Sequence, residues 1–177
     1  DHKGIDLELL KHLKEVERAR LTAYAEARPD AVHHSGGCIW DIPCQVAVPC
    51  ATQNEISGRD ARMLVSNGCI AVAEGANMPS SPEAIRVFTA AGVFFAPGKA
   101  ANAGGVATSA LEMQQNASRD RWSFAHTEAR LAEIMKGIHT ACYETAEEYG
   151  APGDYIKGAN ITGFQRVAQA MAALGLV

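Results

Sequence analysis

The sequence lacks the features that mark membrane, nucleic-acid-binding and secreted proteins. No apolar run among its 177 residues approaches the roughly 18 residues that a membrane-spanning helix needs. The net charge of −4 offers no basic surface to a polyanion. The first ten residues, DHKGIDLELL, do not follow the basic-then-apolar plan of a secretory signal. We therefore expect a cytoplasmic protein without nucleic-acid or membrane partners.

Signatures of metal sites and of common catalytic machinery are also missing. The cysteines are odd in number and form no C-x-x-C pair, which disfavours zinc and a complete disulfide framework and favours reduced thiols. They are Cys38, Cys44, Cys50, Cys69 and Cys142. No G-x-G-x-x-G phosphate turn, G-x-S-x-G elbow, P-loop or H-E-x-x-H motif occurs. We therefore assign no metal site and no catalytic residue within the chain.

Three short apolar runs alternate with helical patterns in the middle of the chain. The runs cover residues 45–49, 69–73 and 93–96, and their continuous apolar character is typical of parallel strands buried on both faces. The intervening helices end at Asn67-Gly68 and at Gly92, and the second begins at Ser81-Pro82. This order predicts an α/β fold with a parallel sheet.

Helices are expected at both ends of the chain. At the amino end, Asp6 caps a helix whose apolar face carries Leu9, Leu10, Leu13 and Val16, and a second helix covers 19–27. Two long helices close the chain, and Gly175 ends the second. Their predicted core-facing stripes are Leu131, Ile134, Met135, Ile138 and Cys142 in the first, and Ile161, Phe164, Val167, Ala168 and Met171 in the second.

Ligands of open α/β sheets bind beyond the carboxyl ends of the strands. The segments there, 50–54, 74–78 and the glycine-rich loop 97–105, combine small residues with Asn and Gln. Small residues let a flat ligand approach the backbone, and a side-chain amide both donates and accepts, as recognition of a carboxamide such as nicotinamide requires. The alternative is that each Asn caps a helix or satisfies a turn. Glu74 and Asp41 lie near this edge, where either could orient a loop.

A helix follows Gly104-Gly105, and its first turns carry Thr108 and Ser109. Backbone N–H groups at a helix start attract an anion, so Ser109 is a candidate donor to a bound carboxylate. Equally, either hydroxyl can bond back to a carbonyl of its own helix. The residues alone leave both interpretations open.

Several segments resemble the carboxyl-terminal part of hexameric glutamate dehydrogenases. The resemblance covers nearly the whole chain, in order and spacing, and is greatest to the small NADP-linked subfamily of bacteria, algae and protists. The matching segments are WDIP (40–43), PCATQNE (49–55), VAEGANMP (72–79), APGKAANAGGVATSALEM (96–113) and KGANITGF (157–164).

The resemblance implies an oxidoreductase of amino-acid metabolism and nitrogen assimilation. Its reaction is the reversible oxidative deamination of L-glutamate to 2-oxoglutarate and ammonia, with hydride transfer to NADP or, alternatively, NAD. It places Asn54 and Asn77 along the nicotinamide end of the cofactor. The glutamate pocket would then be lined by Asn102, Gly105, Val106 and Ser109, with Ser109 bonding the side-chain carboxylate. The family usually has Gly after this Ser, where the present chain has Ala110.

The resemblance also implies a domain plan. Residues 1–122 would be the second half of a Rossmann-like NAD(P)-binding domain, and residues 123–177 closing helices that pack back toward a substrate domain of a cytoplasmic homohexamer. The family's catalytic Lys and Asp and its phosphate turn belong to preceding sequence. Two alternatives are a dehydrogenase of leucine, phenylalanine or valine, which needs an apolar side-chain pocket, and a non-catalytic truncated product for binding or assembly.

We predict that the purified 177-residue chain alone does not reduce NADP or NAD in the presence of glutamate, because the Lys, the Asp and the phosphate turn are missing from it. Absorbance at 340 nm, with chain free of host enzyme, measures this. Turnover above a mock purification would contradict the prediction.

Overall fold

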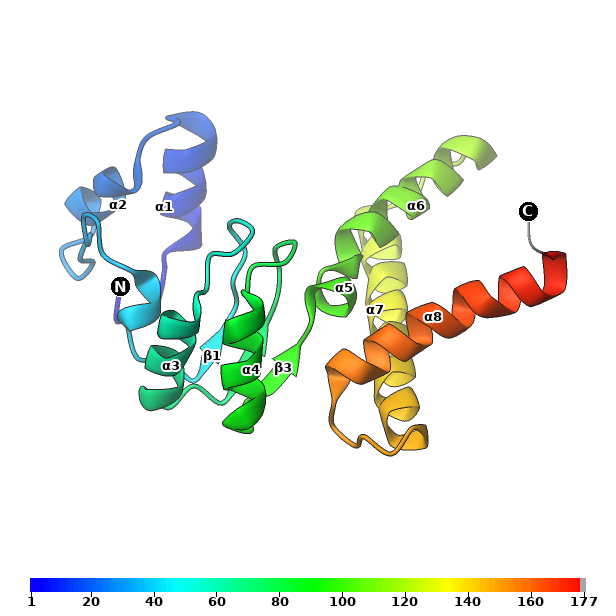
Figure 1. Ribbon diagram of the computed structural model, residues 1–177. Coiled ribbons are helices and arrows are strands. Elements are labelled where there is room, and N and C mark those ends of the chain that lie inside the picture. The colour runs from blue at the N-terminus through cyan, green and yellow to red at the C-terminus, as the bar shows by residue number, and fades with distance from the viewer. Residues whose placement is uncertain (176–177) are drawn as a thin grey trace. The chain divides into compact units, whose positions relative to one another are not determined.

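The computed structural model describes residues 1–175. The chain forms two compact units, Asp1–Ile39 and Trp40–Val177, coloured from blue to red along the sequence in Figure 1. The predicted division of residues 1–122 from residues 123–177 concerns the domains of a longer enzyme and stays a prediction. None of the helices within residues 1–175 is long and apolar enough to cross a membrane.

The amino-terminal unit begins with a capped helix, as predicted. The Asp6 carboxylate accepts a hydrogen bond from the Leu9 N–H at 3.1 Å. The helix then widens into a π-helical turn, which rotates later side chains away from the expected face. Leu13 is buried but Val16 is exposed, so the predicted apolar stripe is wrong at its last member. The elements are α1 (Leu7–Lys11), η1 (His12–Val16) and α2 (Leu21–Ala27).

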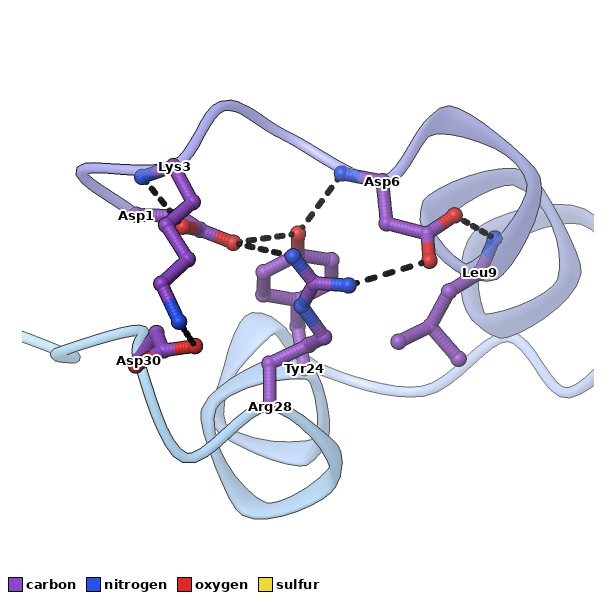
Figure 2. A network of polar contacts seen from close by, with 7 residues as sticks. All are labelled: Asp1, Lys3, Asp6, Leu9, Tyr24, Arg28 and Asp30. Atoms are coloured by element: carbon purple, nitrogen blue, oxygen red, sulfur yellow. Dashed lines mark hydrogen bonds and ion pairs between the residues drawn. The ribbon is translucent and has the colours of Figure 1, made fainter.

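A polar network holds α2 to the start of α1 (Figure 2). The Arg28 guanidinium donates to the carboxylates of Asp1, at 3.2 Å, and Asp6, at 3.3 Å. The Tyr24 hydroxyl accepts from the Asp6 N–H at 2.8 Å and donates to the Asp1 carboxylate at 3.1 Å. Lys3 pairs with Asp30 at 2.7 Å. Tyr24 is itself buried, so this unit combines polar bonds with a small apolar core.

The second unit contains a three-stranded parallel sheet in the order β1-β2-β3. Its central register places Ala47 beside Val72 and Val72 beside Phe95. The predicted α/β fold with a parallel sheet is confirmed. The strands are β1 (Val46–Ala47), β2 (Ala71–Ala73) and β3 (Phe94–Ala96), and a 3-10 turn, η2 (Ile39–Asp41), precedes them.

Helices α3 (Gly58–Ser66) and α4 (Pro82–Ala90) connect these strands. Ser57 and Asp60 form a reciprocal capping box on α3. The Ser81 hydroxyl accepts from the Ala84 N–H at the start of α4, where Pro82 occupies the first turn. The glycines predicted to stop both helices have left-handed backbone, with φ of +86° at Gly68 and +70° at Gly92.

Both connecting helices lie on one side of the sheet (Figure 1), as right-handed crossovers that proceed in one direction require. The covered side includes Leu64, Val72 and Phe88, all fully buried, and the Phe88 and Phe95 rings stack at 5.9 Å. On the opposite side Val46 is 55% exposed and Phe94 is also exposed. The expectation that both faces are covered is therefore wrong at Val46, whereas the Tyr155 ring packs edge-on against Phe94 at 4.9 Å.

Four helices follow β3, and α7 packs against both α6 and α8 (Figure 1). The long helix α8 contacts its neighbours through buried Tyr155, Gly158 and Ala159. The predicted core stripe of α8 is wrong at Phe164, which is 72% exposed, and at Val167 and Met171, which are also exposed. Ile161 and Ala168 are half-buried. Small residues permit close approach of two helices, which directs the larger side chains elsewhere. The bounds are α5 (Gly98–Ala101), α6 (Ala103–Ser118), α7 (Phe124–Glu148) and α8 (Tyr155–Leu174).

Substitution of Gly by Ala should have opposite effects on stability at two positions of α8. A Cβ at Gly158 would overlap the Cys142 carbonyl oxygen of α7, whereas a Cβ at Gly163 meets nothing within 4 Å. We expect Gly158→Ala to lower the free energy of unfolding by about 1–3 kcal/mol through overpacking. Gly163→Ala should raise it by about 0.5–1 kcal/mol, since Ala is the better helix former. Urea denaturation of both variants measures the difference; equal shifts would contradict the α7–α8 packing.

Candidate functional site

A cavity of about 470 Å³ lies at the carboxyl edge of the sheet. This volume falls within the roughly 300–1,000 Å³ of small-molecule sites. The cavity brings together three predicted site residues, Asn54, Asn77 and Asn102. Its other polar lining residues are Glu74, Ser80 and Lys99. The predicted crevice thus exists, with one amide from each of the three segments that follow a strand.

The first two crevice segments are held in left-handed backbone conformations. Asn54 has φ of 54° and Met78 has φ of 52°, and the Asn54 N–H donates to the Met78 carbonyl at 2.9 Å. Asn tolerates this region, but a Met there costs about 1–2 kcal/mol. Such strain persists where surrounding structure fixes it, and it clusters at ligand sites. The two loops are therefore constrained against each other at the cavity.

The amides of Asn54 and Asn77 remain available to a ligand. Both residues are exposed, and neither side chain forms a hydrogen bond with any residue between 1 and 175. Asn102 differs, because its Nδ2 donates to the Ala76 carbonyl at 2.9 Å. Its side-chain oxygen accepts no hydrogen bond from residues 1–175. The helix-capping alternative is not observed for Asn102, which makes no side-chain cap bond to α6.

The third segment is mostly helical. Residues 98–101 form α5, and α6 begins at Ala103, so Gly104 and Gly105 lie inside the helix. The prediction of a loop through residue 105 is wrong, because Pro97 starts a helical turn in which the Asn102 N–H bonds the Gly98 carbonyl. The Gly105 N–H, expected to be free for an anion, donates to the Asn102 carbonyl at 3.4 Å.

The other predicted substrate residues lie on the first two turns of α6. Gly105, Val106 and Ser109 are exposed and do not line the 470 Å³ cavity. The Ser109 hydroxyl donates to the Gly105 carbonyl at 3.3 Å, and Thr108 makes the equivalent bond to Gly104 at 2.9 Å. The within-helix bond left open by the sequence is thus formed, and the role of Ser109 toward a substrate stays a prediction.

Glu74 is the residue whose importance the sequence did not establish. It follows β2 directly, lines the cavity and is only 4% exposed. Its carboxylate accepts hydrogen bonds from the backbone N–H groups of Ser80 and Gly98. The only sequence signal of this burial is that a Glu directly follows an apolar strand. A Glu at such a position can equally well be exposed, so the signal does not predict that Glu74 is buried.

Two thiols outside the cavity lining have raised pKa values. Burial raises the pKa of the Cys142 thiol, and burial together with neighbouring Cys69 raises that of Cys44, so both thiols favour the unreactive protonated form. Within residues 1–175 no group of three or more His, Cys, Asp or Glu side chains is placed to bind a metal ion. The site is suited to binding and orienting a ligand through amides and backbone.

Comparison with known proteins decides the family. Residues 1–175 match the model of the Glutamate/Leucine/Phenylalanine/Valine dehydrogenases. The chain belongs to this family. It is 50% identical, over 99% of its length, to the NADP-specific glutamate dehydrogenase of Helicobacter pylori strain 26695. It is 49% identical over its full length to that of Escherichia coli K12.

Solved structures of glutamate dehydrogenases share the fold. The crystal structure of Plasmodium falciparum glutamate dehydrogenase matches 97% of the chain with a TM-score of 0.93 and 42% identity. The chain spans about 41% of the H. pylori protein, 40% of the E. coli protein and 37% of the P. falciparum chain. The Rossmann-like sheet of this dehydrogenase chain is therefore partial, as the resemblance implied.

Substitution of Asn by Asp should have different effects at Asn102 and at Asn160 of this dehydrogenase chain. Asn102 uses its amide as a donor to Ala76, whereas Asn160 accepts from the Lys99 ammonium. We expect Asn102→Asp to lower the free energy of unfolding by about 1–3 kcal/mol, because Asp cannot donate. Asn160→Asp keeps the acceptor and should change stability by less than about 0.5 kcal/mol. Urea denaturation compares them, and equal losses would argue against the Asn102 bridge.

Proposed function

We propose that the chain is the carboxyl-terminal part of an NADP-dependent glutamate dehydrogenase. The enzyme would interconvert L-glutamate with 2-oxoglutarate and ammonia while transferring hydride to or from the cofactor. The observation that carries the proposal is the convergence of three side-chain amides on one cavity, in a chain half identical to enzymes with this name. An activity on leucine, phenylalanine or valine has no comparable support.

The cavity suits the nicotinamide end of the cofactor. The amides of Asn54 and Asn77 have unused donors and acceptors, which a carboxamide needs in equal measure. NADP, when bound, supplies the carbon that accepts hydride from glutamate. The names of the H. pylori and E. coli relatives favour NADP. A relative from Xylanibacter ruminicola, 45% identical, is named NAD(P)-specific, so NAD remains an alternative cofactor.

Glutamate would bind along α5 and the start of α6. Asn102, Gly105 and Val106 would line this pocket, and Ser109 would donate its hydroxyl to the side-chain carboxylate. Exposure of Ser109 supports this role, because the hydroxyl is accessible on the helix surface. Ala110 follows it in the same helix and is exposed as well, so its methyl group leaves the Ser109 hydroxyl in place.

The rest of a full-length enzyme would supply the catalytic Lys and Asp. Residues 1–122 would complete the cofactor domain, and residues 123–177 would pack toward the substrate domain. The exposed apolar side chains of α8, such as Phe164 and Val167, support a further covering partner for these helices. Assembly as a homohexamer and location in the cytoplasm complete the proposal.

We expect Ser109→Ala in the full-length enzyme to lower kcat/KM for glutamate by about ten- to a hundredfold, because a hydrogen bond to a charged group is lost. The kcat/KM for norvaline should stay unchanged, since the norvaline side chain has no carboxylate that needs a hydrogen-bond donor. Steady-state kinetics with both amino acids measure the ratio of the two efficiencies.

Thr108→Ala is the matched control. Thr108 is also exposed and bonds back to its own helix, so its loss should leave the glutamate-to-norvaline ratio unchanged. If Ser109→Ala also left that ratio unchanged, Ser109 would be a helix residue and the proposed glutamate pocket would be wrong.

A further inference from the structure

The Glu74 carboxylate lies between two of the segments that form the cavity. Its Oε1 accepts from the Ser80 N–H at 3.2 Å, and its Oε2 accepts from the Gly98 N–H at 2.7 Å. Ser80 follows shortly after Asn77, whereas Gly98 is the first residue of α5, which leads to Asn102. One side chain on the end of β2 therefore joins segments that are far apart in the sequence.

The side-chain oxygens of Glu74 have only backbone hydrogen-bond partners within residues 1–175. No ion pair within residues 1–175 includes Glu74. Hydrogen bonds to a buried ionised acceptor are stronger than neutral ones, and the loss of a partner is correspondingly costly. The carboxylate thus fixes both N–H groups without a flexible cationic side chain.

Gly98 approaches the Glu74 carboxylate so closely that a side chain at this position would be tightly packed. A Cβ at this position would lie 3.2 Å from Glu74 Oε2, 3.2 Å from the Ala76 carbonyl oxygen and 3.3 Å from Asn102 Nδ2. Asn102 Nδ2 also bonds Ala76. Two hydrogen-bonded links therefore run in parallel between the segment after β2 and the segment after β3.

We infer that Glu74 is a positioning residue for hydride transfer, and this inference rests on the proposed function. Asn77, on one side of the carboxylate, would bind the nicotinamide carboxamide, and Asn102, on the other side, would line the glutamate pocket. Glu74 sets the spacing between these two groups, and through them the spacing between the hydride donor and the acceptor carbon. It acts through the backbone N–H groups of Ser80 and Gly98, and the inference assigns it no proton transfer.

Glu74→Gln in the full-length enzyme tests the inference. Gln has the same shape, but its amide group faces one of the two N–H donors and cannot accept from it. Since misplacement by about 1 Å can cost a hundredfold in rate, we expect kcat to fall by about ten- to a hundredfold. A primary deuterium isotope effect on kcat, with glutamate deuterated at Cα, should rise as hydride transfer becomes slower.

Binding of adenosine 2′,5′-bisphosphate separates positioning from general structure. This probe is the adenosine part of NADP with its 2′-phosphate and one 5′-phosphate, and it lacks the nicotinamide riboside. Its dissociation constant should therefore stay within about twofold of the wild-type value. The control Glu83→Gln changes an exposed carboxylate that pairs with Arg62 at 2.9 Å, and it should leave kcat and the isotope effect unchanged.

Unchanged kcat and isotope effect in Glu74→Gln would overturn the inference, as would an equal loss of bisphosphate binding and turnover. If that variant does not fold, Glu74→Asp applies the test with the carboxylate kept, because its shorter side chain cannot reach both the Ser80 and the Gly98 N–H groups; normal kcat would again overturn the inference. Absence of glutamate-dependent NADP reduction in the wild-type full-length enzyme would instead refute the proposed function, and with it the inference.

Discussion

Parallel pairing of three short strands is the constraint on which the site depends. The register that sets Ala47, Val72 and Phe95 side by side also makes the three following segments emerge at one edge of the sheet. Each strand is only two or three residues long, so the ladder alone does not hold these segments. Additional hydrogen bonds join these segments beyond the ends of the strands. One links Asn54 to Met78 and another links Glu74 to Gly98, so the segments keep their positions around the cavity.

Local sequence signals predicted the parts of the fold that local interactions decide. Ser81-Pro82 and Gly92 delimit α4 because capping and left-handed backbone are properties of a few adjacent residues. The alternation of strands and helices required a parallel sheet, and the sheet required a crevice at its carboxyl edge. For this reason Asn54, Asn77 and Asn102 could be placed together without knowledge of any tertiary contact.

The features that sequence reasoning missed depend on partners far along the chain. The apolar stripe of α8 has the spacing of a core face, yet Gly158 and Ala159 make the contact with α7 and leave Phe164 exposed. Periodicity shows that a helix has an apolar side, but it does not identify the side that the neighbouring helix covers. The burial of Glu74 is similar, since it follows from backbone N–H groups donated by segments 6 and 24 residues away.

The proposed role of Ser109 requires one hydroxyl to serve both the helix and a ligand in turn. A hydroxyl has a single hydrogen, and a carboxylate only accepts. Ser109 therefore has to release the Gly105 carbonyl before it can donate to a substrate carboxylate. The bond to be exchanged is 3.3 Å long, near the limit of a useful hydrogen bond, and it lies on an exposed helix surface where water can satisfy the carbonyl. The exchange would thus cost little, and under the proposed function the within-helix bond would hold the hydroxyl until a carboxylate replaced the carbonyl as its acceptor.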